Sequence, residues 1–304
     1  MSAPIAIFAY NRPSHLEAVL DALAQNPQAR DSDVHIFCDG PKTAKQLEAT
    51  NAVRAVADNA RGFGRVEVVK RPENWGLSRS IVSGVSEICD RYGSAIVLED
   101  DVVPTPFFLG YVNDALVRYR DDARVASVGC HTFDSGMELP ETFFLDVPDC
   151  WGWGVWKRSW DSYEADGAAL LARIREQKRE AEFDFDGTYP YLQMLADQVL
   201  QRNDSWAVRW YARTFIDRSL TLYPRRPVTQ NIGFDGSGVH GGRSPDYVVG
   251  KLLEAPISVH AVALERSDLA REAWKTSFRQ MLDKPKASLM RRIQRRIVSL
   301  APWR

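Results

Sequence analysis

The chain has 304 residues, 45% of them hydrophobic and 26% charged, with a formal net charge of -1 at pH 7. This size and composition suffice for a full core, and the near-neutral charge gives no global signal for nucleic-acid binding. No apolar run approaches the roughly 18 residues that span a bilayer, and the N-terminus lacks the pattern of a signal peptide. Four scattered cysteines without CxxC spacing indicate reduced core residues, so we expect a cytoplasmic protein.

The first half of the chain alternates apolar runs with amphipathic stretches. Strands are predicted at 4–10, 34–38, 66–69, 95–98 and 125–128, and helices at 13–23, 44–59, 78–91 and from 105, where Thr105 and Pro106 look like a cap and first turn. This alternation predicts an α/β fold with a mostly parallel, doubly wound sheet. The second half is less regular, with helical patterns around 170–178, 191–202 and 206–218, a short strand at 220–223 and a charged, helical stretch after 262.

Three consecutive acids, Glu99, Asp100 and Asp101, directly follow the apolar run at 95–98. Ligands in open α/β sheets bind beyond the carboxyl ends of the strands. Carboxylates gathered there repel one another unless a cation lies among them, and oxygen ligands suit Mg²⁺ or Mn²⁺, which often bridge to substrate phosphates. The alternative is that the acids only end the strand or cap the next helix.

Two other predicted strands also end in polar residues. Tyr10, Asn11 and Arg12 follow the first strand, where Arg12 could form forked hydrogen bonds to a diphosphate or could be a surface arginine. Asp39 follows the second strand and could accept from a base or ribose, or form a turn before Gly40. The sequence has no GxGxxG after the first strand and no GxxxxGK[ST], which argues against a dinucleotide-binding or P-loop enzyme.

Taken in order, the segments 4–12, Asp39, 74–78 and 98–104 resemble glycosyltransferases of the GT-A fold, in particular animal N-acetylglucosaminyltransferase I and related bacterial sugar transferases. The resemblance implies a Rossmann-like, mostly parallel sheet flanked by helices. It implies a transferase domain at 1–262, with a nucleotide-sugar half (1–130) and an irregular acceptor half (131–262), followed by a basic helical tail (263–304).

The resemblance also implies roles for individual residues. The acidic triplet corresponds to a variant DXD motif, in which Asp101 binds Mn²⁺ (or Mg²⁺). The implied donor contacts are Arg12 at the diphosphate, Asp39 at the base, and Glu99 and Asp100 at the ribose or sugar. Tyr10, Asn11, Asn74 and Ser78 are implied to bind the donor nucleotide as well.

The second half supplies the remaining candidates. Trp151 and Trp153 could stack on a sugar or belong to the core, whereas Trp156 and Trp160, at helical spacing, are predicted to be core residues. The resemblance places a catalytic base near Trp206, and the best matching carboxylate is Asp204, with Asp217 and Asp235 as alternatives.

Two further segments complete the prediction. The glycine-rich stretch 233–242 resembles a loop that closes over the donor, and His240 within it could reach the diphosphate or serve structure. From residue 284 a basic amphipathic stretch could bind an anionic membrane surface from the cytoplasmic side, or pack on the protein's own core or a second subunit.

The predicted activity is a metal-dependent, inverting, hexosyltransferase-type glycosyltransferase that uses a nucleotide-diphosphate sugar and a glycan or lipid-linked acceptor in surface glycan synthesis. The alternatives are a sugar nucleotidyltransferase and a non-catalytic carbohydrate-binding protein on a degenerate transferase fold.

Overall fold

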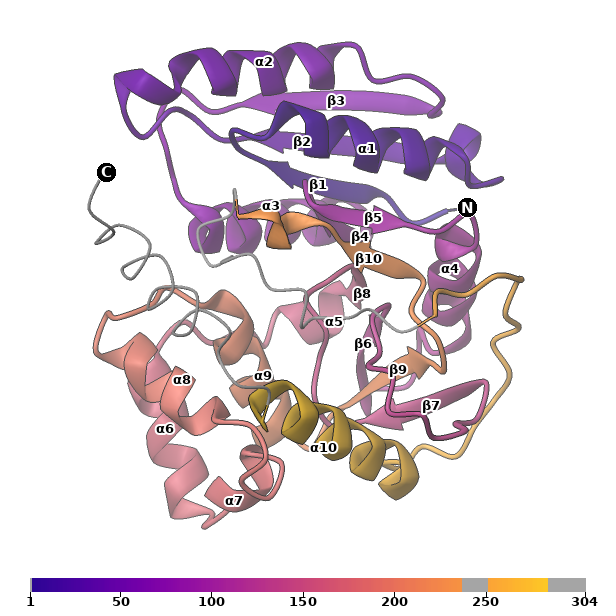
Figure 1. The fold of residues 1–304 in the computed structure, drawn as a ribbon, viewed down its shortest axis with the longest axis vertical. Helices are drawn as coiled ribbons and strands as arrows, with labels where there is room; N and C mark the ends of the chain where they lie inside the picture. Colours follow the sequence, from indigo (N-terminus) through magenta and orange to yellow (C-terminus); the bar gives the residue numbers. More distant parts are fainter. Residues whose placement is uncertain (1, 237–250, 284–304) are drawn as a thin grey trace, which may run out of the picture.

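The computed structural model describes residues 2–236 and 251–283. Within them, an eight-stranded sheet is flanked by helices, and two further strands pair with each other as a separate ribbon (Figure 1). In spatial order the sheet strands are β3 (Arg65–Lys70), β2 (Asp33–Cys38), β1 (Ile5–Ala9), β4 (Ser94–Glu99), β8 (Trp153–Trp156), β6 (Val125–Gly129), β9 (Leu220–Pro224) and β7 (Thr142–Leu145). The ribbon pairs β5 (Val102–Pro104) with β10 (Thr229–Asn231). The α/β class is confirmed.

Most strands of the sheet point in the same direction. Strands β3, β2, β1 and β4 are parallel, β8 is antiparallel to both β4 and β6, β9 is parallel to β6, and β7 is antiparallel to β9. The expected mostly parallel sheet is therefore confirmed, and the carboxyl ends of β1, β2, β3, β4 and β6 meet at one edge. Strands β7 and β8 were not predicted from the sequence.

Ten α-helices surround the sheet within the described residues. They are α1 (Pro13–Ala24), α2 (Leu47–Asp58), α3 (Leu77–Tyr92), α4 (Phe108–Arg118), α5 (Lys157–Trp160), α6 (Gly167–Glu176), α7 (Glu180–Phe183), α8 (Tyr191–Val199), α9 (Trp206–Ile216) and α10 (Asp268–Asp283). The sequence placed the first residue of α4 at Pro106, but the helix begins two residues later, at Phe108. No helix in the described ranges is long and apolar enough to cross a bilayer.

The core forms three clusters. Helices α1, α2 and α4 pack on one face of the sheet, and α3 packs on the other together with a group of tryptophans from β8, α5 and α9. The third cluster contains side chains of β7 and of the five helices α6, α7, α8, α9 and α10. Trp156 and Trp160 are 3% and 2% exposed, so their prediction as core residues is confirmed.

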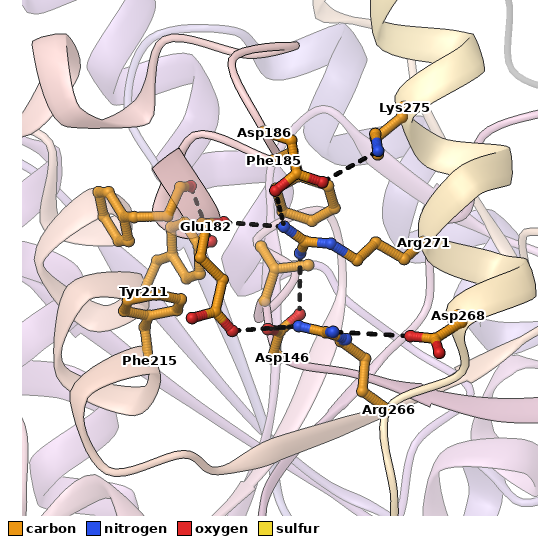
Figure 2. Close-up of polar contacts among 12 residues, drawn as sticks. Asp146, Glu182, Phe185, Asp186, Tyr211, Phe215, Arg266, Asp268, Arg271 and Lys275 are labelled. Carbon is orange, nitrogen blue, oxygen red and sulfur yellow. Dashed lines mark hydrogen bonds and ion pairs between the residues drawn. The ribbon is translucent and has the colours of Figure 1, made fainter. Parts of the chain in front are cut away.

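Helix α10 is the helix expected after residue 262, and a network of charges fastens it to the second half of the chain (Figure 2). Arg271 lies 3.5 Å from both Asp146 and Asp186 and stacks on the ring of Phe185. The other pairs are Arg266 with Asp146, Glu182 and Asp268, and Lys275 with Asp186 and Glu272. The side chain of Arg271 is 5% exposed, so this part of the network is largely shielded from solvent.

Replacing Arg271 with Met should therefore lower the free energy of unfolding by about 3 kcal/mol, because Asp146 would keep a buried charge with one partner fewer. Arg124 pairs with Asp122 on the surface, and Arg124→Met should cost less than about 1 kcal/mol. Urea unfolding of both variants measures the difference. Equal losses would mean that the network contributes no more than a surface pair.

Candidate functional site

The acidic triplet and the turn after β1 meet at the carboxyl edge of the sheet. Strands β1 and β4 are neighbours in parallel register, with Phe8 opposite Glu99. The guanidinium of Arg12 hydrogen-bonds Asp100 and lies 2.9 Å from Asp101. The N–H of Tyr10 donates to the other oxygen of Asp100 over 3.2 Å. Asn11 lies in the same turn, so residues 10–12 and 99–101 form one unit.

Acidic groups outnumber basic ones in this unit, since the guanidinium of Arg12 contacts two carboxylates, those of Asp100 and Asp101, and Glu99 is a third acid beside them. Burial, together with the neighbouring charges of Asp101 and Asp100, raises the pKa of Glu99 to about 8. Burial also raises the pKa of Asp100, although Arg12 opposes this change. In turn, Asp100 and Asp101 outweigh burial and raise the pKa of Arg12. A cation at this place would relieve the repulsion between the carboxylates.

The start of the glycine-rich segment packs directly on the acids. Strand β10 pairs with β5, and the N–H of Ile232 donates to the backbone carbonyl of Asp101 over 2.8 Å. A Cβ atom on Gly233 would lie 2.1 Å from Oδ2 of Asp101 and 3.1 Å from the guanidinium of Arg12. Only glycine allows this close approach. The prediction for His240 concerns a residue outside the described ones, as does the basic stretch 284–304.

Gly233→Ala should displace Asp101 or Arg12, and we expect it to weaken binding of a metal–nucleotide complex by about tenfold or more. Gly110→Ala is the matched control, because its new Cβ would meet only an ordinary contact at 3.4 Å. Calorimetric titration of both variants with Mn²⁺ and nucleoside diphosphate measures the effect. Unchanged affinity in Gly233→Ala would mean that the close packing of Gly233 on Asp101 does not contribute to ligand binding.

Asp39 shapes a neighbouring loop. Its Oδ1 accepts from the N–H groups of Gly40 and Trp75 (2.9 and 2.8 Å), and its Oδ2 accepts from the side chain of Asn74 and the N–H of Gly76 (both 3.0 Å). A carboxylate offers about four acceptor positions, so these donors occupy Asp39 fully. These bonds support the local structural interpretation of Asp39, and its contact with a base stays a prediction.

Asp204 is joined to the same edge through Arg209. The guanidinium of Arg209 donates to the hydroxyl of Ser78 over 2.7 Å and to Asp204 over 3.3 Å. Ser78 is in the first turn of α3, directly after the loop that Asp39 fixes. The side chain of Arg209 is 10% exposed, whereas that of Asp204 is 74% exposed and free to meet a ligand.

The two alternative carboxylates differ in position. Asp217 pairs with Arg213 at the far end of α9, about 16 Å from the end that bears Asp204, so it does not belong to the site. Asp235 lies 3.3 Å from His15 at the start of α1. It is two residues after Gly233, which packs on Asp101, so Asp235 is close to the acidic unit.

The two tryptophans predicted to line a sugar site, Trp151 and Trp153, differ in burial. Trp153 is 1% exposed and stacks on Trp206, so its predicted role in a sugar-binding wall is wrong, since burial leaves no ring face for a ligand. Trp151 is half-buried, with its ring 5.6 Å from that of Phe234 and 4.6 Å from that of His131.

The chemistry of the acidic unit suits Mn²⁺ or Mg²⁺. No group of three or more His, Cys, Asp or Glu in the described parts of the chain forms a complete metal cage. Such ions, however, are commonly held by one or two carboxylates together with substrate phosphates. Asp101, whose side chain is 13% exposed, is the residue best placed to share an ion with a bound diphosphate.

Sequence reasoning missed two residues of this region, Arg209 and His131. Arg209 lies three residues after Trp206, on the buried face of α9. A charged residue on the apolar face of a predicted helix could have indicated that it has a specific partner. His131 lies just beyond the carboxyl end of β6. Ligands bind beyond the carboxyl ends of such strands, so the reasoning that identified Asp101 and Arg12 could also have identified His131.

No protein-family model matches this chain, and no curated protein matches its sequence. Among solved structures, it is similar to a mannosyltransferase from Pyrobaculum calidifontis in complex with GDP-Man and Mn²⁺ (16% identity, TM-score 0.36, 57% of this chain and 46% of that one). It is also similar to TarS from S. aureus in complex with UDP-GlcNAc (10%, 0.31, 45% and 37%). A third likeness is to a cytidylyltransferase from Leptospira borgpetersenii (14%, 0.32, 53% and 63%).

The chain spans less than two thirds of the length of each of these three proteins. All three TM-scores lie below 0.5, and therefore none of these proteins assigns a function to this chain.

Proposed function

We propose that this protein is a metal-dependent, hexosyltransferase-type glycosyltransferase that moves a sugar from a nucleoside-diphosphate donor to an acceptor hydroxyl. The supporting observation is the unit of Glu99, Asp100 and Asp101 against Arg12, covered by Gly233 at the carboxyl edge of a mostly parallel sheet. Its excess negative charge calls for a divalent ion, and its guanidinium suits a diphosphate.

Each residue has a defined task in this proposal. A divalent ion at Asp101, when bound, supplies Lewis-acid stabilisation of the leaving diphosphate. Arg12 donates hydrogen bonds to the diphosphate oxygens, while Asp100 orients Arg12. Asp204 accepts the proton from the acceptor hydroxyl. Direct attack by that hydroxyl from the face opposite the leaving group inverts the anomeric centre.

A panel of nucleotide sugars, each with Mn²⁺, tests the proposal by thermal stabilisation and by the product released. Release of nucleoside diphosphate from one donor is the expected result. Release of pyrophosphate on incubation with a sugar phosphate and a nucleoside triphosphate would instead identify a nucleotidyltransferase. Sugar binding without turnover of any donor would identify a carbohydrate-binding protein.

The basic stretch 284–304 extends the proposal to surface glycan synthesis at the inner face of a membrane. It combines arginines with an apolar stripe, the composition of helices that lie in the headgroup layer. We expect the full chain to sediment with anionic liposomes at low salt and a version ending at Asp283 to stay in the supernatant. Equal behaviour of the two would remove the membrane from the proposal.

A further inference from the structure

Three arginines from separate elements meet at the start of α3, on the carboxyl edge of the sheet. Arg71 directly follows β3, and Arg79 lies in the first turn of α3. The guanidinium carbon of each lies 4.0 Å from the ring centroid of Trp75, in the loop just before the helix. Arg209 of α9 reaches the same turn through its hydrogen bond to Ser78. Positive charge is therefore concentrated at this helix end.

Arg71 is buried without a counter-charge. It is 5% exposed, and within residues 2–236 and 251–283 its guanidinium donates one hydrogen bond, to the hydroxyl of Ser80. Burial lowers the pKa of Arg71, and the carboxylates whose charges oppose this change, Asp39 and Glu87, form no ion pair with it. Its Nε and Nη2 have no partner but keep accessible surface, so both can meet a ligand. A charge shielded from water in this way is unfavourable until an anion joins it.

The first turn of α3 adds backbone donors. The helix has 16 residues, and no side chain caps its start. The N–H groups of Leu77, Ser78 and Arg79 have no acceptor in the part of the chain that the structure describes. Such N–H groups carry partial positive charge and bind phosphate groups in many proteins. Guanidinium groups match phosphate oxygens with forked hydrogen bonds, so Arg71 and Arg79 complement these backbone donors.

The neighbouring acids do not balance the arginines. The acceptor positions of Asp39 are filled by N–H groups of its own loop. Arg209 is paired with Asp204, so these two together contribute no net charge. Neither Arg71 nor Arg79 belongs to any ion pair among the described residues. Two guanidiniums and one saturated carboxylate leave an excess of positive charge, which favours an anion over a neutral sugar.

This helix end also adjoins the proposed base. A single nitrogen of Arg209, Nη2, donates to Ser78 over 2.7 Å and to Asp204 over 3.3 Å. Because both oxygens bond the same nitrogen, they lie within two hydrogen-bond lengths of each other. An anion bound at the first turn of α3 would consequently hold the molecule that carries it next to Asp204.

We propose that the first turn of α3, together with Arg71 and Arg79, binds a phosphate group of the acceptor. The acceptor is then a phosphorylated sugar or a sugar linked to a lipid through phosphate. The inference rests on the proposed glycosyltransferase function. The donor diphosphate is assigned to Arg12 beyond β1, which lies about 10 Å from β3 across β2, so the two phosphate positions are separate.

The test is calorimetric titration of the full-length protein with methyl phosphate, in the presence of saturating Mg²⁺ and nucleoside diphosphate to fill the donor site. Arg79→Met and Arg71→Met should each weaken binding about tenfold or more, the loss of a charge-assisted hydrogen bond. Arg91→Met is the matched control, because Arg91 lies in the last turn of α3 and pairs with Glu67 on the surface. It should bind methyl phosphate as the unaltered protein does.

Two further ligands distinguish the sources of the phosphate. Tighter binding of glucose 6-phosphate than of methyl phosphate supports a phosphorylated sugar, and tighter binding of geranyl diphosphate supports a lipid-linked acceptor. Circular dichroism checks that each variant is folded. Arg79 is exposed, so Arg79→Met alone decides the outcome if Arg71→Met does not fold.

The inference is overturned if methyl phosphate does not bind, if it binds only by displacing the nucleoside diphosphate, or if Arg79→Met binds it as well as Arg91→Met does. Reduced affinity of Arg79→Met for the nucleoside diphosphate would also overturn it, since the arginines would then belong to the donor site. If the unaltered protein binds no nucleoside diphosphate, that result counts against the proposed function. Titration with methyl phosphate without nucleotide still tests the site at α3 in that case.

Discussion

Asp101→Asn is expected to abolish Mn²⁺-dependent binding of the donor while the protein remains folded. The neutral amide loses the charge that holds a divalent ion, and second-sphere changes around metals already cost about 10- to 100-fold in affinity, so loss of the ligand itself should exceed about 100-fold. The side chain is 13% exposed and the amide keeps its shape, so stability should change little. Calorimetry with Mn²⁺ and nucleoside diphosphate measures the affinity.

Asp122→Asn provides the control, because Asp122 also pairs with an arginine, but on the surface at Arg124. It should bind the metal–nucleotide complex normally. Unchanged affinity in Asp101→Asn would remove Asp101 as the metal ligand and would leave Glu99 and Asp100 as the carboxylates to examine.

Asp204→Asn should lower turnover by roughly 10²- to 10⁴-fold, the range typical of acid–base groups, and leave donor affinity unchanged. Asp204 touches Arg209 but none of the acids at the end of β4, and its side chain is 74% exposed, so the exchange removes a proton acceptor without disturbing the core. Steady-state kinetics with the donor identified by the panel provides the measurement.

Asp197→Asn, an exposed aspartate on α8 that pairs with Arg202, is the control and should retain full turnover. Near-normal turnover in Asp204→Asn would transfer the role to Asp235, because Asp217 is too far away at the other end of α9.

The strand ends were predictable because burial and chain direction are both visible in the sequence. An apolar run followed by Glu99, Asp100 and Asp101, or by Arg12, can only place those side chains where a buried strand leaves the sheet. The rule places Arg12 and the acids at the same edge, and their contact follows from the pairing of β1 with β4, which the rule does not predict.

Other features depended on contacts between distant segments. The saturation of Asp39 requires backbone N–H groups some 35 residues later to fold back onto it, and no local pattern reveals this. Trp151 and Trp153 are two residues apart and look alike in sequence, yet the start of β8 between β4 and β6 turns one into the core and leaves the other half-buried.

Strand β8 has a consequence for how the molecule works. Its backbone is hydrogen-bonded on one side to β4, which carries the acids, and on the other to β6, which leads to His131. A continuous ladder of this kind leaves no hinge between the two halves, so they do not open and close as separate lobes. The distance between the acids at the end of β4 and His131 at the end of β6 is then set by the sheet itself. Under the proposed function, entry of the substrate and exit of the product fall to loops and side chains.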